Sequence, residues 1–304
     1  MAFTSPLLTF LLLLFTTITT TLAAKASPGC SSTPKLITPS SSPTRLTTTI
    51  ASKTREYFVL LPPNFSPTTP HRLVLTLHAL GGTASQVIAG TGGYVPWYGL
   101  SALSSQAVAQ NASKIPTVFV APNGLDNGWA NTNGNDVSFI QSILTTVTND
   151  LCIDTNLVFS TGFSFGGAMS YMLACSLPAN TLRGVAVLSG NPQISGSCAA
   201  ATQGFPVAYY GQHGMADSVL PIDGGRAMRD RFVKSNGCST IGQVVEPAKG
   251  SGQKHAVNEF QGCAKDKPVV WAAFDGDHTP TPKDKGDQST WTPAESWRFF
   301  ERFV

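Results

Sequence analysis

Residues 162–166, Gly-Phe-Ser-Phe-Gly, fit the pattern Gly-x-Ser-x-Gly, which presents a serine as a nucleophile when a strand precedes it and a helix follows. An apolar run at 157–159 predicts the strand, and residues 167–175 predict the helix. The turn between them is so tight that glycine is needed two residues on either side of Ser164. We expect the Ser164 hydroxyl at the helix N-terminus; the alternative is an ordinary glycine-rich turn.

An acid and a histidine follow Ser164 in the order that nucleophilic catalysis by serine uses in an α/β-hydrolase. Asp217 follows a predicted strand at 205–210, and His278 follows another at 268–274. A neutral imidazole can take the serine proton during attack on a carbonyl, while a carboxylate orients the imidazole and stabilises its charged form. The three residues therefore predict a serine hydrolase that forms an acyl-enzyme.

Other acids compete with Asp217 for this role. Asp223 lies further along, where it is expected to cap the helix that leads to Val233. Asp275 and Asp277 adjoin His278 too closely to orient it, and are expected to shape its loop.

Four other histidines must also be weighed against His278. His213 lies four residues before Asp217, but a structural role is favoured because it leaves Asp217 free to serve His278. His71 and His255 are expected at the surface, and His78 is expected to brace the turn that follows it.

Attack on a carbonyl also needs N–H donors for the oxyanion. The backbone N–H of Phe165 is the first candidate, because Phe165 directly follows the serine. The second is expected from the loop 78–82, His-Ala-Leu-Gly-Gly, with Leu80 N–H preferred; the alternative for these glycines is a plain turn.

The surrounding pattern alternates apolar strands with amphipathic helices, which predicts a mostly parallel sheet covered on both faces, an α/β fold. Further strands are expected at 55–61, 72–78, 117–121 and 184–188. A helix over 137–151 is expected to start at an Asp136 cap, and a last helix at a capping box of Thr292 and Glu295. Because chemistry collects at the carboxyl ends of parallel strands, Ser164, Asp217 and His278 are expected to meet there.

The N-terminus has the features of an exported protein. Residues 1–24 read as a signal peptide, residues 25–52 as an irregular lead rich in Ser, Thr and Pro, and residues 53–304 as a single catalytic domain. Six cysteines predict three disulfides, and the one pairing that we predict is Cys238–Cys263. Asn111 is an open glycosylation acceptor.

Composition limits the classes of molecule that the protein is expected to bind. The net charge of +3 is scattered, which disfavours nucleic acid, and beyond the signal peptide no apolar run is long enough to span a membrane. The cysteine spacing lacks Cys-x-x-Cys, so neither a metal nor a cofactor is expected. We expect a monomer that acts on a neutral polymer.

Five motifs together resemble the fungal secreted feruloyl esterases of carbohydrate esterase family 1, which are similar to polyhydroxybutyrate depolymerase catalytic domains. They are LHALGG (77–82), GWANT (128–132), GFSFGG (162–167), HGMAD (213–217) and GDHTP (276–280). The resemblance implies an α/β-hydrolase fold, with nucleophile Ser164, acid Asp217, base His278 and oxyanion donors at Leu80 and Phe165. The chain departs from the family pattern at Ala79 and Asp277, where relatives commonly have glycine.

The resemblance also implies a substrate, a feruloyl ester of plant cell-wall polysaccharide. Trp129 is expected to contact the aromatic acyl group, whereas Tyr94, Trp97 and Tyr98 could form an aromatic wall or pack in the core. The alternatives are an acetylxylan esterase, an esterase similar to polyhydroxybutyrate depolymerase, and a non-catalytic binding module on the same scaffold.

Overall fold

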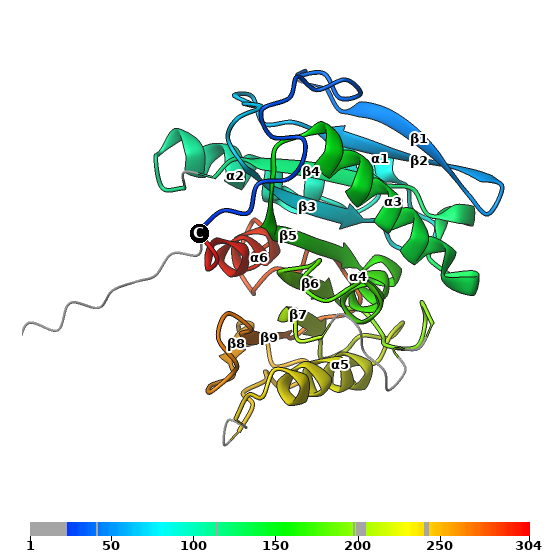
Figure 1. The fold of residues 1–304 in the computed structure, drawn as a ribbon. Coiled ribbons are helices and arrows are strands. Elements are labelled where there is room, and N and C mark those ends of the chain that lie inside the picture. Colours follow the sequence, from blue (N-terminus) through cyan, green and yellow to red (C-terminus); the bar gives the residue numbers. More distant parts are fainter. Residues whose placement is uncertain (1–22, 41, 114, 197, 199–204, 240–242) are drawn as a thin grey trace, which may run out of the picture.

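The computed structural model describes residues 23–40, 42–113, 115–196, 198, 205–239 and 243–304 (Figure 1). The predicted signal peptide, residues 1–24, therefore lies almost entirely outside the described residues. No helix in the described ranges combines the length and apolar character needed to cross a membrane.

One sheet runs through the described part of the chain, with nine strands in the order β1-β2-β4-β3-β5-β6-β7-β9-β8 (Figure 1). The strands are β1 (Thr44–Ile50), β2 (Lys53–Leu60), β3 (His71–Leu77), β4 (Thr117–Pro122), β5 (Ile153–Phe163), β6 (Gly184–Leu188), β7 (Ala208–Gly214), β8 (Ala256–Glu259) and β9 (Val269–Phe274). From β4 to β9 all neighbours pair in parallel, while β1, β2 and β8 pair antiparallel at the two edges. The predicted mostly parallel sheet is confirmed.

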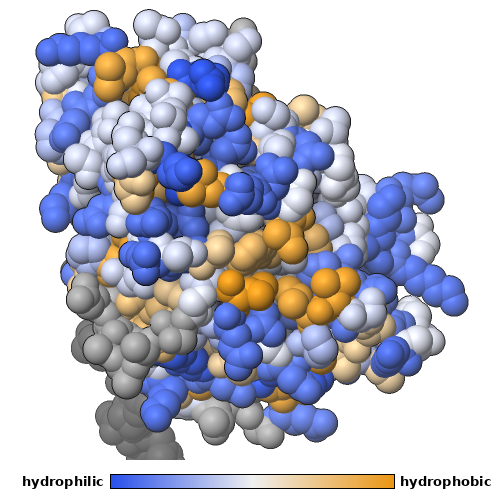
Figure 2. All heavy atoms as spheres, turned by 90° about the vertical axis from the view of Figure 1, so that its right-hand side faces the viewer, coloured by the Kyte–Doolittle hydropathy of each residue, from blue (hydrophilic) through white to orange (hydrophobic). Residues whose placement is uncertain are grey.

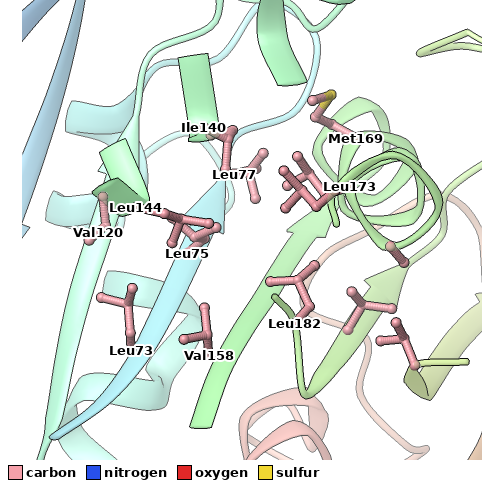
Figure 3. Close-up of a cluster of buried hydrophobic side chains, with 14 of the residues drawn as sticks. Leu73, Leu75, Leu77, Val120, Ile140, Leu144, Val158, Met169, Leu173 and Leu182 are labelled. Carbon is pink, nitrogen blue, oxygen red and sulfur yellow. The ribbon is translucent and has the colours of Figure 1, made fainter. Parts of the chain in front are cut away.

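Helices cover both faces, because successive strand side chains point to opposite sides. Leu73, Leu75 and Leu77 of β3 belong to the core beneath α3, α4 and α5, and Val74 belongs to the core beneath α1, α2 and α6. Figure 3 shows the first core, where Leu75 and Leu77 meet the side chains of α3 and α4. The helices are α1 (Ala84–Ala89), α2 (Leu100–Ala109), α3 (Asn135–Asp150), α4 (Phe165–Ser176), α5 (Ile222–Ser235) and α6 (Thr292–Glu301), with short 3-10 turns η1 (Pro96–Gly99), η2 (Leu125–Asn127) and η3 (Thr132–Gly134).

The N-terminal lead is more ordered than its composition predicts. Its Thr-rich end forms β1, because β-branched residues suit an edge strand that pairs with β2. Upstream, the Asp150 carboxylate accepts the backbone N–H groups of Lys35 and Ile37 at 2.7 and 3.0 Å, and Cys30 is bonded to Cys152. The expectation of an irregular segment over 25–52 is therefore wrong for 44–50.

All six cysteines form disulfides, and the predicted Cys238–Cys263 pair is confirmed. The other two bonds join Cys30 to Cys152 and Cys175 to Cys198.

The predicted helix caps are corrected. Gly134, in the left-handed conformation at φ 75°, precedes α3, and Asp136 lies inside the first turn, paired with Arg55 at 2.7 Å. Thr292 is the first residue of α6 and makes no capping bond, because its hydroxyl accepts Gln212 Nε2–H at 2.9 Å, and Glu295 pairs with Arg298. Asp223 likewise lies within the first turn of α5, where its exposed carboxylate contacts Arg226 at 2.8 Å.

Candidate active site

Ser164 lies on a strained turn between β5 and α4, with φ 56° and ψ −115°. A side chain at Gly162 would lie 2.5 Å from the backbone of Gly166, and one at Gly166 would lie 2.3 Å from the carbonyl oxygen of Leu77. The predicted need for glycine on both sides of the serine is confirmed. The strain is consistent with a functional position, since the backbone aims one side chain out of a crowded turn.

The structure brings Ser164, His278 and Asp217 together at the carboxyl edge of the sheet. His278 Nδ1 lies 2.7 Å from Asp217 Oδ2, and His278 Nε2 lies 2.9 Å from Ser164 Oγ. Because an ionised carboxylate only accepts hydrogen bonds, Nδ1 carries the imidazole proton and Nε2 is free to accept the serine proton. The Phe163 ring packs on the imidazole with centroids 4.5 Å apart.

The Asp217 carboxylate is fully buried and well supplied with donors. Its Oδ1 accepts the backbone N–H groups of Val219 and Leu220, at 3.0 and 2.7 Å. Burial alone raises the pKa of this carboxyl, but hydrogen bonds from His213, His278 and Leu220 outweigh burial and hold the pKa well below its usual range. Asp217 therefore carries a negative charge next to His278 at any pH near neutrality.

Two other acids, Asp277 and Asp275, form hydrogen bonds that join the loop of His278 to neighbouring loops. Asp277 Oδ1 accepts the backbone N–H groups of Ser218 and His278, both at 2.7 Å. Asp275 accepts the N–H groups of Gly250 and Gly252, both at 2.6 Å. The expectation that these acids shape the loop rather than orient the histidine agrees with their contacts.

The loop that follows β3 is held so that one N–H group stays without a partner. Ala79 N–H donates to the Tyr94 hydroxyl at 2.8 Å, and Gly81 N–H donates to the Asn127 carbonyl at 2.8 Å. In the described part of the chain, Leu80 N–H and Phe165 N–H make no contact with a loop carbonyl or side chain. A Cβ at Gly166 would lie 2.6 Å from His78 O, so the start of α4 borders this loop.

His78 and Trp129 lie beneath the same loop. Trp129 Nε1–H donates to the His78 carbonyl at 2.8 Å, and His78 Nε2 accepts Gly124 N–H at 2.9 Å. Burial lowers the pKa of His78, which keeps the imidazole neutral as this acceptor role requires. The predicted bracing role of His78 fits these contacts, but Trp129 is fully buried and cannot contact a substrate ring, which corrects its expected role.

Tyr94, Trp97 and Tyr98 are buried packing residues, which decides between the two alternatives. The Tyr98 hydroxyl donates to the Leu77 carbonyl at 2.7 Å and accepts Phe163 N–H at 3.0 Å. Tyr98 therefore joins the strand before the loop 78–82 to the strand before Ser164. No sequence signal marked this role, because it depends on contacts between segments far apart in the chain.

The remaining histidines differ from expectation. His71 is fully buried, with Nδ1 3.0 Å from the Cys152 carbonyl and the Phe65 ring stacked on its imidazole. His255 is half-buried and stacks on Trp291 with ring centroids 4.0 Å apart. The expectation that both lie at the surface is wrong.

Several apolar side chains are exposed in loops at the carboxyl edge of the sheet. The face at which β3 and β5 end, on the right of Figure 1, is shown in Figure 2, where an apolar strip crosses a largely polar surface. Exposed Leu80, Leu125, Ile194 and Val219 all lie in loops that follow parallel strands. A Cβ at Gly128 would lie 3.0 Å from Phe165 Cε1 and 3.3 Å from Leu80 Cδ1, so these two side chains meet next to Gly128.

In the ranges that the structure describes, no cluster of three or more His, Cys, Asp or Glu side chains is placed to hold a metal ion.

Comparison with known proteins agrees with this architecture. A family model described as phospholipase/carboxylesterase matches residues 67–261. The chain is 46% identical to feruloyl esterase D of Neurospora crassa, over 98% of both chains. It is 44% identical to feruloyl esterase C of Emericella nidulans, over 81% of this chain and 83% of the relative.

Solved structures show the same fold at low identity. An acetyl xylan esterase from Aspergillus awamori matches 84% of this chain and 99% of its own, with a TM-score of 0.58 and 17% identity. A ferulic acid esterase matches 87% of this chain and 100% of its own, with a TM-score of 0.56 and 16% identity. The predicted α/β-hydrolase fold is confirmed, and the chain belongs to the phospholipase/carboxylesterase family and to the fungal feruloyl esterases.

Proposed function

We propose that the chain is a secreted, monomeric serine esterase that releases ferulate and related hydroxycinnamates from feruloylated plant cell-wall polysaccharide. The observation that carries the proposal is the continuous hydrogen-bonded path from Ser164 Oγ through His278 to Asp217, in a chain nearly half identical to a feruloyl esterase over its full length. Secretion is supported by the apolar N-terminal segment and by three disulfides, which persist in oxidising compartments.

The geometry supports a two-step mechanism. His278 Nε2 takes the Ser164 proton as Oγ attacks the ester carbonyl, and Asp217 stabilises the resulting imidazolium. The tetrahedral oxyanion accepts the N–H groups of Phe165 and Leu80, each worth roughly 3 kcal/mol in comparable sites. Collapse expels the ester oxygen of the sugar, which takes the proton from His278 to become a hydroxyl, and leaves the acyl group on Ser164. Water then attacks in the same way and releases the free acid.

An aromatic acyl group suits the surface next to Ser164. Leu80 and Phe165, whose backbone N–H groups face the developing charge in this proposal, also place apolar side chains next to Gly128. Leu80 is 68% exposed, and so has apolar surface available to a ligand. These residues replace Trp129 as the proposed acyl contacts.

Two measurements on the purified mature protein test the proposal. A fluorophosphonate should label Ser164 stoichiometrically and leave Ser164→Ala unlabelled, as read by peptide mass spectrometry. The protein should release ferulate and p-coumarate from their methyl esters and from feruloylated arabinoxylan, with a much lower kcat/KM on acetylated xylan and polyhydroxybutyrate. Preference for acetyl or hydroxybutyrate esters would overturn the proposed feruloyl substrate. Lack of both labelling and turnover would favour the alternative of a non-catalytic binding module.

A further inference from the structure

His213, near the end of β7, is fully buried and fixed on two sides. Its ring stacks on Trp271 of β9, with centroids 6.4 Å apart. A Cβ at Gly225 of α5 would lie only 2.4 Å from His213 Nδ1, so the helix backbone presses directly on the ring. The imidazole is therefore held in one orientation, away from solvent.

The hydrogen bonds of His213 determine which nitrogen carries the proton. Nε2 lies 2.7 Å from the Leu220 carbonyl oxygen and 3.2 Å from Asp217 Oδ2, and both of these atoms are acceptors. Nε2 must therefore carry the hydrogen, which it donates to the Leu220 carbonyl, and the same N–H lies next to Asp217 Oδ2. Nδ1 has no partner among the described residues, so a proton there would be buried without an acceptor. These contacts place His213 as a hydrogen-bond donor through Nε2.

With this contact the Asp217 carboxylate has four N–H groups within 3.2 Å, as many as its two oxygens can accept. Oδ1 takes the N–H groups of Val219 and Leu220, and Oδ2 takes His278 Nδ1–H and His213 Nε2–H. Leu220 closes the arrangement, because it donates to Asp217 and accepts from His213. The carboxylate can rotate away from His278 only by breaking bonds on both oxygens.

We propose that His213 is a positioning residue for the reaction proposed above: it holds the Asp217 carboxylate ionised and aimed at His278, and takes no part in proton transfer. The inference rests on the proposed roles of Ser164, His278 and Asp217. It assigns a function to a histidine whose sequence position alone indicated only a structural role.

Other charged groups near His213 act at longer range. Asp277 binds the loop of His278 on one side. Glu246 accepts the indole N–H of Trp271 at 2.9 Å and Arg229 lies over the same ring, while Arg226 and Asp223 pair on α5. None of these side chains contacts the His213 ring in the described residues. The effect of replacing His213 on activity should therefore arise mainly from the changed surroundings of Asp217 and His278.

A matched pair of substitutions isolates the donor. His213→Gln keeps an N–H group near the position of Nε2, and His213→Met has a similar shape without it. A hydrogen bond to a charged group is worth enough that the Met variant should lose about 10- to 100-fold in kcat/KM. Without the donor, the Asp217 charge favours the His278 imidazolium more strongly, so the acid limb of the pH profile should move to higher pH. In the Gln variant, the acid limb of the pH profile should stay at the same pH as in the parent enzyme.

His71→Met is the matched control, because His71 is equally buried and also has one ring nitrogen bonded to a backbone carbonyl and the other without a partner. It should leave the pH profile unchanged. Melting curves set an assay temperature at which each variant is folded. A Met variant with the parent profile, or equal losses and shifts in the Met and Gln variants, would overturn the inference. If Ser164→Ala retained turnover, the proposed function itself would fail instead.

Discussion

The indole N–H of Trp129 donates to the backbone carbonyl of His78 at 2.8 Å, and the two rings lie 4.9 Å apart in the interior. The contact places a rigid aromatic residue under the loop that carries Leu80, not in front of the substrate. His78 Nε2 also accepts the N–H of Gly124, and the Tyr94 hydroxyl accepts the N–H of Ala79. Buried aromatic residues thus fix the loop from which an oxyanion donor is proposed.

Ser164→Ala is expected to abolish ester hydrolysis and leave the fold intact. The only side-chain hydrogen bond of the hydroxyl among the described residues is to His278, so its removal takes away the nucleophile and breaks no other such bond. Turnover of methyl ferulate and the thermal midpoint check both halves of this expectation. Residual turnover near the parent rate would place the nucleophile elsewhere.

Asp217→Asn should lower kcat by orders of magnitude, because an amide can present N–H to His278 and favour the wrong tautomer. Asp223→Asn is the control, since its side chain is 84% exposed and contacts Arg226. Steady-state kinetics of both variants should separate them by at least about 100-fold. The acid would be wrongly assigned if Asp223→Asn were the impaired variant.

Tyr98→Phe removes a buried hydroxyl that bonds both Leu77 O and Phe163 N–H. We expect a loss of about 1–3 kcal/mol in the free energy of unfolding, because two backbone groups lose a partner, together with a lower kcat as the turn of Ser164 loosens. Urea denaturation and kinetics measure the two effects. Tyr209→Phe is the matched control: its buried hydroxyl has no partner among the described residues, so its loss should not destabilise the protein.

Leu80→Ala should reduce kcat/KM for methyl ferulate more than for a short aliphatic ester. The backbone N–H remains, while the apolar contact proposed for the aromatic ring is lost. Val245→Ala provides a control, because Val245 is 62% exposed and precedes the edge strand β8, outside the candidate site. Equal losses on both esters would remove Leu80 from the acyl site.

His255 is expected to make stability depend on pH. Burial lowers its pKa, but the nearby carboxylates of Glu295 and Asp284 outweigh burial and raise the pKa above the ordinary 6.5. Because the folded-state pKa is raised, this stabilisation is fully present below about pH 6.5 and is lost as pH rises through the folded-state value. Melting from pH 5.5 to 8.5 should show a decline that His255→Gln reduces; an unchanged decline would exclude this histidine.

Much of the candidate site could be predicted from the sequence because its signals are local. Only glycine fits on either side of Ser164, where neighbouring backbone lies within 2.5 Å of an added Cβ, and that requirement is visible in five consecutive residues. The parallel sheet could be predicted because buried strands need continuous apolar runs. The order Ser164, Asp217, His278 then placed all three residues at the same edge.

Tertiary structure decided what depends on contacts between distant segments. Trp129 lies in a loop rich in polar residues and is buried by packing under the loop after β3, while His71 begins β3 and is covered by the Phe65 ring and bonded to the Cys152 carbonyl. The Thr-rich strand β1 exists because β2 offers it an edge, and composition alone indicated an irregular segment. The contact of His213 with Asp217 likewise depends on Gly225 and Trp271, which hold the His213 ring in place from two other elements. A local pattern can specify which residue types meet, but only the packed chain determines which atoms of those residues face each other.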